Sequence, residues 1–418
     1  MNWKTVPLIA GAMSKLILLS IIAMPATVAA PAFAQYTLTT LASFNGANGS
    51  WPYAALTLSG SILYGTTTSG GASGDGAVFS MPMTGGMPTI LASFNGTNGD
   101  LPFAGLTLSG TTLYGTTEFG GAYGDGVVFS IPVTGGTPTV LTSFSGANGA
   151  YPKARLTLSG NTLYGTTSGG GASGDGEVFS VPLTGGIPTI LLSFNGANGD
   201  QPWAGLTLSG NTLYGTTLYE GPNGDGEVFS VPVTGGTPAI AAFNLADGDV
   251  PEADLTLSGH TLYGDTLGGG AYGDGVVFSV PVTGGTPTVL ATFNGTNGNM
   301  PFAGLTLSGN TLYGTTRFGG ANDDGEVFSV PVTGGTPTVL ISFDGANGEG
   351  PQADLTLLGN TLYSTTVIGG NLNLNGGRGD GTVFAISLPE PASAGLLAIG
   401  SLALLRRVRR IGHRTVAG

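Results

Sequence analysis

The sequence predicts an all-β fold, a seven-bladed β-propeller of four-stranded antiparallel blades closed by the N-terminal strand pairing in the last blade. The first observation is that Leu-Thr-Leu-Ser-Gly, or Leu-Thr-Leu-Leu-Gly in the last copy, recurs seven times at a spacing of 49 or 50 residues. The second is that each copy offers four short runs typical of strands. The third is that the repeat region begins with a segment matching the fourth strand of a repeat and ends after the third strand of the last repeat. The repeats begin at Leu56, Leu106, Leu156, Leu206, Leu255, Leu305 and Leu355.

The first repeat illustrates the four strands, which we expect at residues 54–59, 62–67, 77–83 and 88–94. Each is β-branched or aromatic and bounded by Gly or Pro. Ser-Gly-Asn joins the first two strands in most copies and Thr-Gly-Gly joins the last two, and both are hairpin sequences. Tight reversals favour an antiparallel meander over the alternative fold, a parallel β-helix. Four strands in a period of about 40 to 50 residues are typical of propeller blades.

The two ends of the repeat region predict how the ring closes. Residues 36–44 read as an outermost strand, whereas the last repeat stops after its third strand at residues 382–388. Pairing these two segments would complete the seventh blade and leave no open blade edge, which all-β proteins avoid. The innermost strands carry Ala, Gly and Ser, which are small enough to converge on an axis.

The composition is unusual for an enzyme, but it supports an ordered fold. The 418 residues include 77 Gly, 25 Pro and no Cys, and only 8% are charged. Gly at this level could indicate disorder, but 41% hydrophobic residues in short regular runs supply a core. Disulfides do not hold the fold together.

The first 34 residues are expected to be a signal peptide. Lys4 and Lys15 precede an apolar run at 16–30, and Ala32-Phe33-Ala34 before Gln35 matches a signal-peptidase site. An N-terminal membrane anchor is the alternative. We therefore expect export through the inner membrane, with the propeller at residues 35–388.

The C-terminal segment, residues 389–410, is expected to be a sorting signal followed by a tail at 411–418. It combines an apolar run at 392–405 with two flanking motifs, Pro389-Glu390-Pro391 and the cluster Arg406, Arg407, Arg409 and Arg410. Fourteen apolar residues make a helix of about 21 Å, too short for a durable span of a ~30 Å hydrocarbon core. The arginines are expected on the cytoplasmic side.

This segment resembles the PEP-CTERM sorting signal of Gram-negative bacteria. The resemblance implies recognition and cleavage by an exosortase, transient anchoring in the inner membrane by the C-terminal helix, and a final location at the cell surface or outside the cell. A plain C-terminal tail anchor is the alternative.

Charge argues against nucleic acid and anionic lipid as partners. Residues 35–388 hold 23 acidic and four basic residues, a formal charge of −19. Such a surface repels polyanions. It favours cations or neutral polar ligands, although solubility alone also explains it.

The repeats resemble the GloVer tandem repeat family of exported bacterial proteins. The shared motifs are Leu-Tyr-Gly-Thr-Thr, the Gly-Gly that follows, and Asp-Gly-x-Val-Phe, over residues 36–388. The resemblance implies no activity. Two departures stand out, Asp265 in place of Thr in the fifth copy and Ser364 in place of Gly in the seventh.

Binding residues are expected where the blades differ, because a feature present in every repeat is most simply structural. The seven Asp that precede Gly before the third strand are expected to turn a loop, with a ring of cation ligands as the alternative. The connections that vary emerge on one face. The candidate ligand-binding residues at the mouth of the innermost strands are Tyr53, Phe103, Lys153, Arg155, Trp203, Glu252, Phe302 and Gln352.

Aromatic faces stack on sugars while carboxylates and amides bind hydroxyls, so this ring suits a carbohydrate or a peptide. The alternative is that these side chains only cover neighbouring blades. Other loops add Glu118, Phe119, Arg317 and Phe318 to the same face. Arg378-Gly379-Asp380 follows an insertion in the seventh copy, but its Asp is the ordinary turn residue of the repeat.

One acidic segment could hold Ca²⁺, since Asp247, Asp249, Glu252 and Asp254 offer oxygen ligands within eight residues. Their spacing does not match an EF-hand, and a solvated acidic loop is the alternative. No other cofactor is expected.

Catalysis has little support in the sequence. The only histidine before the tail is His260, in a hairpin on the opposite face, and no nucleophile-elbow or phosphate-loop motif occurs. We expect a non-enzymatic surface or matrix protein that binds extracellular polysaccharide or a surface protein. The alternatives are a glycosidase or lyase using Glu252 or Asp254, and a structural spacer without a ligand.

Overall fold

A computed structural model describes residues 36–389 of the chain. The expected signal peptide and, apart from Pro389, the expected sorting signal and tail lie outside the described residues, so both remain predictions. Within the described residues, no helix is long and apolar enough to cross a membrane.

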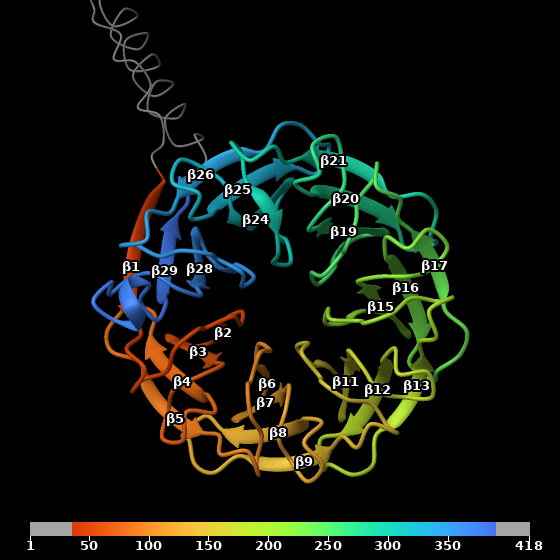
Figure 1. Ribbon diagram of the computed structural model, residues 1–418, viewed down its shortest axis with the longest axis horizontal. Coiled ribbons are helices and arrows are strands. Elements are labelled where there is room, and N and C mark those ends of the chain that lie inside the picture. The colour runs from red at the N-terminus through yellow and green to blue at the C-terminus, as the bar shows by residue number, and fades with distance from the viewer. Residues whose placement is uncertain (1–35, 390–418) are drawn as a thin grey trace, which may run out of the picture. The chain divides into compact units, whose positions relative to one another are not determined.

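Residues 36–389 form seven antiparallel sheets arranged as blades around an axis, which confirms the predicted propeller (Figure 1). The innermost strands are β2 (Thr57–Ser59), β6 (Thr107–Ser109), β10 (Thr157–Ser159), β14 (Thr207–Ser209), β18 (Thr256–Ser258), β23 (Thr306–Ser308) and β27 (Thr356–Leu358). The second strands are β3 (Ile62–Thr67), β7 (Thr112–Thr117), β11 (Thr162–Thr167), β15 (Thr212–Thr217), β19 (Thr261–Thr266), β24 (Thr311–Phe318) and β28 (Thr361–Thr366).

The third strands are β4 (Ala77–Pro82), β8 (Val127–Pro132), β12 (Glu177–Pro182), β16 (Glu227–Pro232), β20 (Val276–Pro281), β25 (Glu326–Pro331) and β29 (Thr382–Ser387). The outermost strands are β5 (Thr89–Ser93), β9 (Thr139–Ser143), β13 (Thr189–Ser193), β17 (Ala239–Ala242), β21 (Thr288–Thr292), β26 (Thr338–Ser342) and β1 (Thr37–Ser43). Blade 6 has an additional short strand, β22 (Asn299–Pro301), which pairs with β24. Blade 7 carries a 3₁₀ helix at Asn375–Gly377.

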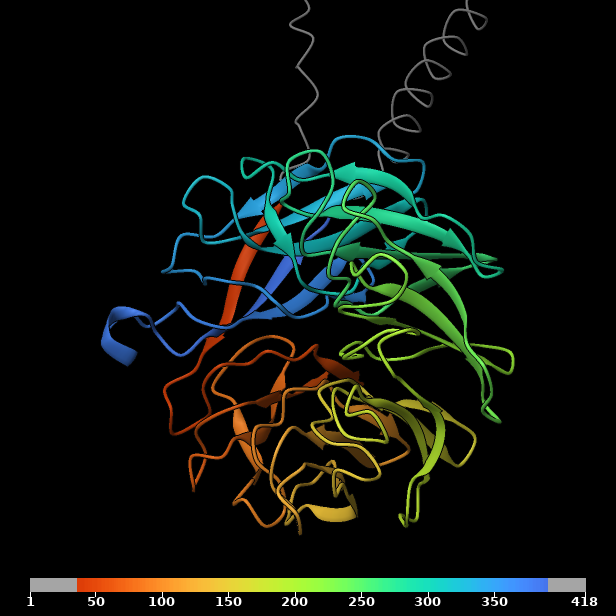
Figure 2. The same cartoon turned by 45° about the vertical axis from the view of Figure 1, so that its right-hand side comes forward.

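The ring closes as predicted, because β1 supplies the outermost strand of blade 7. It pairs antiparallel with β29 from Thr37 opposite Ser387 to Ser43 opposite Thr382. The two strands lie side by side in both ribbon views (Figures 1 and 2). The two ends of the repeat region therefore hold each other within one sheet.

The innermost strands are shorter than predicted, since β2 covers Thr57–Ser59 rather than residues 54–59. The preceding residues bond to a neighbouring blade instead of pairing within their own. For example, the Thr66 hydroxyl donates to the carbonyl of Ala104 in the next blade. The freed segments turn toward the axis, where they line the site described below.

Pairs of buried phenylalanines join each blade to the next. A Phe that follows an outermost strand meets a Phe of the next blade's third strand edge to face, with ring centroids 4.8–5.1 Å apart. The pairs Phe343–Phe384 and Phe44–Phe79 extend this pattern across the closure. Such pairs stabilise by about 0.5–1.5 kcal/mol beyond the burial of their area.

Hydroxyl groups on the innermost strands add a second bond between blades. Thr57 donates through Oγ1 to the carbonyl of Leu106 in the next blade. The same bond joins Thr356 of blade 7 to the carbonyl of Leu56 in blade 1, over 2.7 Å. The first and last blades therefore contact each other as any other neighbours do.

Candidate functional site

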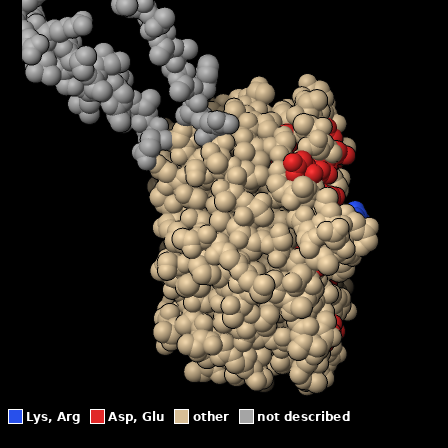
Figure 3. All heavy atoms as spheres, turned by 90° about the vertical axis from the view of Figure 1, so that its left-hand side faces the viewer, with Lys and Arg blue, Asp and Glu red and all other residues tan. Residues whose placement is uncertain are grey.

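The charged side chains of the described residues gather on one face of the ring. The connections between second and third strands, and between successive blades, emerge on this side, which we call the long-loop face. Every Lys, Arg, Asp and Glu of residues 36–389 lies in these connections or at the adjoining strand ends. In the edge-on view of Figure 3, the acidic side chains accordingly appear along one side of the ring.

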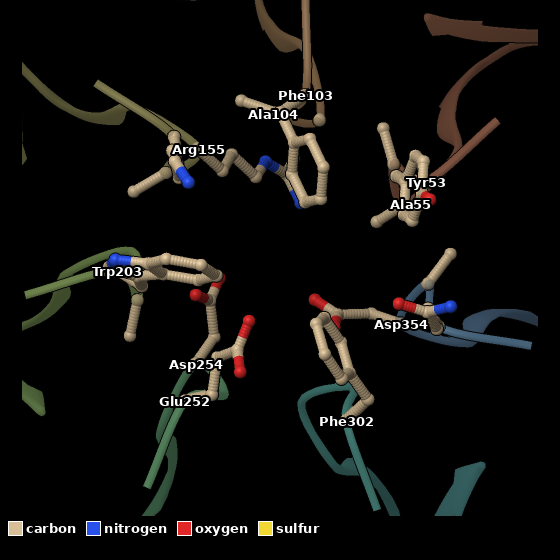
Figure 4. Close-up of a pocket in the computed structure, with 17 residues that line it drawn as sticks. Tyr53, Ala55, Phe103, Ala104, Arg155, Trp203, Glu252, Asp254, Phe302 and Asp354 are labelled. Atoms are coloured by element: carbon tan, nitrogen blue, oxygen red, sulfur yellow. The ribbon is translucent and has the colours of Figure 1, made fainter. Parts of the chain in front are cut away.

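All eight ligand-binding candidates line one pocket at the axis of this face, which we call the axial funnel. Figure 4 shows the aromatic side chains of Tyr53, Phe103, Trp203 and Phe302 around its opening. Glu252 also points into it, together with Asp254 and Asp354. The funnel has a volume of about 90 Å³, room for a few waters or part of a ligand. The structure thus brings together residues that lie up to 299 positions apart in the chain, as the sequence predicted.

Alternating glycines make room for the floor of the funnel. Two positions after the mouth residue, blades 2, 4 and 6 carry Gly, whereas blades 3, 5 and 7 carry Arg155, Asp254 and Asp354. A Cβ placed on Gly205 would lie 2.8 Å from a carboxylate oxygen of Asp254. The larger side chains therefore fold over the glycine of the preceding blade.

Backbone donors hold the two aspartates of the floor. The N–H of Gly205 donates to Asp254 Oδ1 over 2.5 Å, and that of Gly304 donates to Asp354 Oδ1 over 2.6 Å. Burial raises the pKa of both carboxyls, that of Asp354 to about 7, and the Arg155 guanidinium opposes the rise. Because each aspartate is bonded by a backbone amide, the two carboxyl groups are fixed in position.

Glu252 is held in its neutral form at pH 7. Burial raises the pKa of Glu252 to about 8, although the positive charges of Lys153 and Arg317 act against the shift. A neutral carboxyl both donates and accepts hydrogen bonds, which suits a hydroxyl-rich ligand.

Some of the aromatic surface serves the protein itself, as the alternative interpretation held. Lys153 Nζ lies 3.7 Å from the centre of the Trp203 ring and 3.0 Å from Glu118 Oε1. Tyr53 and Phe103 stack on each other with ring centroids 4.4 Å apart. The funnel is therefore a preorganised surface whose side chains are already packed against one another.

Asp265 is a buried group whose role the sequence did not reveal. It takes the place of the Thr that, in the first three blades, donates its hydroxyl to a carbonyl of the next blade. Its side chain is 2% exposed, and both its oxygens lack a hydrogen-bond partner among residues 36–389. Burial, reinforced by the nearby Asp354 and Glu252, raises the pKa of Asp265 well above its ordinary value. Both effects favour its protonated form over the carboxylate.

Two grooves flank the axial funnel on the long-loop face. The basic groove, of about 320 Å³, lies where blades 6, 7 and 1 meet and is lined by Trp51, Tyr53, Arg317, Phe318, Glu349 and Arg378 among others. The acidic groove, of about 550 Å³, spans blades 2 to 4 and is lined by Glu118, Phe119, Tyr151, Asp175, Asp200 and Trp203 among others. Each groove shares at least one aromatic residue with the funnel.

Sequence reasoning missed Trp51 and Tyr151, which precede the loop proline in their blades. Both adopt a left-handed backbone conformation, with φ of 58° and 60°, which non-Gly residues rarely do. Trp51 is held there because its N–H donates to the carbonyl of Asp380 and its own carbonyl accepts from Thr68. The conformation leaves both side chains partly exposed at the grooves. The one sign in the sequence that this position faces a groove is that its residue type varies between blades.

The four expected calcium ligands do not form one site. Asp247 lies in its own turn, where it accepts hydrogen bonds from the backbone and side chain of Asn244. Glu252 and Asp254 instead line the axial funnel. Among residues 36–389, no three His, Cys, Asp or Glu side chains are grouped as a metal site requires.

The seven aspartates before the third strands contact the next blade mainly through their backbone. The Asp75 carbonyl accepts from the N–H of Leu101, and the same bond recurs from Tyr151 to Asp125. The Asp75 carboxylate lies over Gly96 of the following blade. This repeated contact fits the structural interpretation of these residues.

Comparison with known proteins identifies the repeat and the fold. A family model described as Gloeobacter/Verrucomicrobia repeat matches residues 27–179 and 159–384. No curated protein matches the chain in sequence.

Solved structures with a similar fold include a europium-containing methanol dehydrogenase, with a TM-score of 0.53, 11% identity, and coverage of 84% of this chain and 93% of that chain. The quinohemoprotein alcohol dehydrogenase of Comamonas testosteroni has a TM-score of 0.52 and 12% identity, covering 85% and 78% of the two chains. Identities this low show a shared fold alone.

Proposed function

The chain belongs to the Gloeobacter/Verrucomicrobia repeat family, and we propose that its propeller is a non-enzymatic module that binds polysaccharide on its long-loop face. The observation that carries this proposal is the axial funnel, where four aromatic side chains surround an opening together with carboxyl groups and the amide of Gln352. Aromatic rings stack on the C–H faces of sugars, and the polar groups bind hydroxyls.

The neighbouring grooves support a ligand longer than one sugar. The funnel alone holds about 90 Å³, but the adjoining grooves of about 320 and 550 Å³ extend the surface in two directions. A chain of sugars can occupy the funnel and a groove at once, and several weak contacts then add to one affinity.

The proposed setting is the bacterial cell surface. The signal-peptide features of residues 1–34 support export, and the Pro-Glu-Pro, apolar and arginine pattern of residues 389–410 supports sorting by an exosortase. The processed protein would then present its propeller to extracellular polysaccharide.

The test is calorimetric titration and array binding of the protein with a panel of extracellular bacterial glycans. We expect saturable binding that Trp203→Ala and Phe103→Ala each weaken about tenfold, which corresponds to about 1.4 kcal/mol. Tyr272→Ala is the matched control, because Tyr272 is 66% exposed on a loop and does not line the funnel. Silence across the whole panel would reject the proposal in favour of a structural or protein-binding role.

A glycosidase or lyase is the second candidate, favoured by one observation. Glu252 is neutral at pH 7 within the funnel, and a protonated carboxyl is the general acid that glycoside cleavage needs. Release of reducing ends from a bound polysaccharide, abolished by Glu252→Gln with binding retained, would establish this function. Absence of products during long incubation with glycans that bind would exclude it.

A further inference from the structure

The four basic residues of the described chain all lie at the pockets of the long-loop face. Lys153 and Arg155 line the axial funnel, and Arg317 and Arg378 line the basic groove. Residues 36–389 also hold 23 acidic residues, so carboxylates greatly outnumber the four cations. Nevertheless, the only ion pair among these residues is Lys153 with Glu118.

The basic groove therefore presents two guanidinium groups without an ion-pair partner among the described residues. Arg317 lies against the ring of Phe318, 4.9 Å from its centre. Arg378 is exposed and influences Glu349, whose pKa it lowers against the raising effects of burial and Asp324, but it forms no ion pair with it. A guanidinium presents N–H groups in a planar fork that matches the two oxygens of a carboxylate.

Aromatic side chains form the walls beside these arginines. Trp51 is 38% exposed and its backbone is fixed by hydrogen bonds to Asp380 and Thr68. Tyr53 joins the groove to the axial funnel, because it lines both. The volume of about 320 Å³ falls within the range of small-ligand sites.

We propose that the basic groove is a subsite for an acidic sugar, a uronate residue of the bound polysaccharide. The carboxylate of the uronate bonds to Arg317 and Arg378, and its ring stacks on Trp51 or Tyr53. This inference rests on the proposed polysaccharide-binding function and specifies the class of sugar.

The acidic groove provides a comparison within the same molecule. Its Phe119 holds the repeat position of Phe318, and Glu118 holds that of Arg317. Tyr151 and Trp51 share a repeat position, although Tyr151 belongs to the middle of its three blades and Trp51 to the last of its three. It carries Asp175 and Asp200, and burial, reinforced by the nearby Asp175, raises the pKa of Asp200. Its one cation, Lys153, is paired with Glu118. A uronate would be repelled there, so the preference for acid is confined to the basic groove.

The negative charge of the propeller as a whole opposes the binding of an acidic sugar, so the attraction of the basic groove acts only at short range. At a formal charge of −19, residues 35–388 repel an acidic polymer at long range. Added salt screens that repulsion as well as the short contacts to the arginines. We therefore specify the test as a comparison of matched ligands at one salt concentration.

The test measures binding of galacturonate, glucuronate and mannuronate oligomers to the processed full-chain protein. Each oligomer is compared with the same oligomer after reduction of its carboxyl groups to alcohols. We expect at least one acidic oligomer to bind ten times more tightly than its reduced counterpart. In the Arg317→Ala/Arg378→Ala variant the two should bind equally, and Arg378→Lys should retain part of the preference. Tyr151→Ala in the acidic groove is the control and should leave the preference unchanged.

Equal binding of acidic and reduced oligomers by the unaltered protein, or a preference that survives in the double variant, would overturn this inference. If Trp203→Ala still weakens the binding of the reduced oligomers in that case, the proposed polysaccharide function stands. Absence of binding by any oligomer, acidic or reduced, would overturn this inference, and binding to the wider glycan panel would then decide the proposed function separately. Because neither arginine forms an ion pair with another described residue, the melting temperature of the double variant should stay close to that of the unaltered protein.

Discussion

Three blades bury a glutamate at the first position of the third strand. Two of these glutamates accept a hydrogen bond from a neighbouring strand, and the third has no such partner among the described residues. Glu177 and Glu326 each accept a hydrogen bond from a serine of the outermost strand, Ser193 and Ser342. Glu227 faces Ala242 in the same register, and within the described part of the chain both of its oxygens are without a hydrogen-bond partner. Burial raises the pKa of Glu227 to about 7.

This arrangement predicts a loss of stability as the pH rises. The folded protein holds the Glu227 proton more tightly than the unfolded chain, whose pKa is near 4.5. The stabilising contribution is complete below about pH 4.5 and is lost as the pH rises to about 7. Its size is up to about 3 kcal/mol, at about 1.4 kcal/mol per pH unit.

Urea unfolding between pH 4.5 and 7.5 measures this effect. Ala242→Ser supplies the missing hydroxyl, so we expect it to raise the free energy of unfolding at pH 7 by about 1 kcal/mol. Ser193→Ala removes the corresponding hydroxyl from Glu177 and should steepen the fall. The explanation is wrong if neither change alters the dependence on pH.

At the scale of elements, the connection between second and third strands relies on glycines for two different reasons. Gly174 and Gly176 both have positive φ, 91° and 94°. A Cβ on Gly174 would meet nothing within 4 Å, whereas one on Gly176 would lie 2.3 Å from the Thr167 carbonyl oxygen and 2.7 Å from Pro202 Cδ. The first glycine supplies only conformation, and the second also lets the next blade approach.

Alanine substitutions should separate these two roles. Gly174→Ala is expected to cost about 1–2 kcal/mol, the strain of a side chain in the left-handed region. Gly176→Ala bears the same strain and must also displace backbone, so we expect a loss at least 2 kcal/mol larger. The measurement is the midpoint of denaturant unfolding, and equal losses would contradict the packing argument.

At the scale of the whole molecule, the closure joins the first and last parts of the described chain. β1 pairs with β29, Phe44 packs on Phe79, and Thr356 bonds to Leu56. Closed rings of this kind leave no blade edge open to other chains.

Removal of the closing strand should therefore open the ring. A chain that begins at Asn45 lacks β1 and Phe44, which leaves β29 unpaired on one side. We expect lower cooperativity of thermal unfolding and aggregation, measured by calorimetry and light scattering. Addition of a peptide of residues 36–44 should restore the transition, and a chain beginning at Gln35 is the control. Unchanged cooperativity in the shortened chain would show that the closure contributes little.

The number of blades, the antiparallel order of the strands and the closure could all be predicted from the amino-acid sequence. These follow from hairpin glycines, a repeat spacing and the position of the first and last strands, all of which act locally or through counting. The sequence also located the ring of candidate residues from Tyr53 to Gln352, because variation against a constant repeat marks positions that the fold does not need.

Which of these side chains contact one another could not be predicted, because those contacts depend on how the seven blades pack around the axis. The ring brings Tyr53 beside Arg317 in the basic groove, and it separates Asp247 from Asp254 despite their nearness in the chain. The exposed position of Trp51 depends on hydrogen bonds to other loops. The short β2 depends on bonds from blade 7, where Thr365 donates to the carbonyls of Pro52 and Ala54. Contacts between blades join residues 49 or 300 positions apart, and such distances in sequence carry no local pattern.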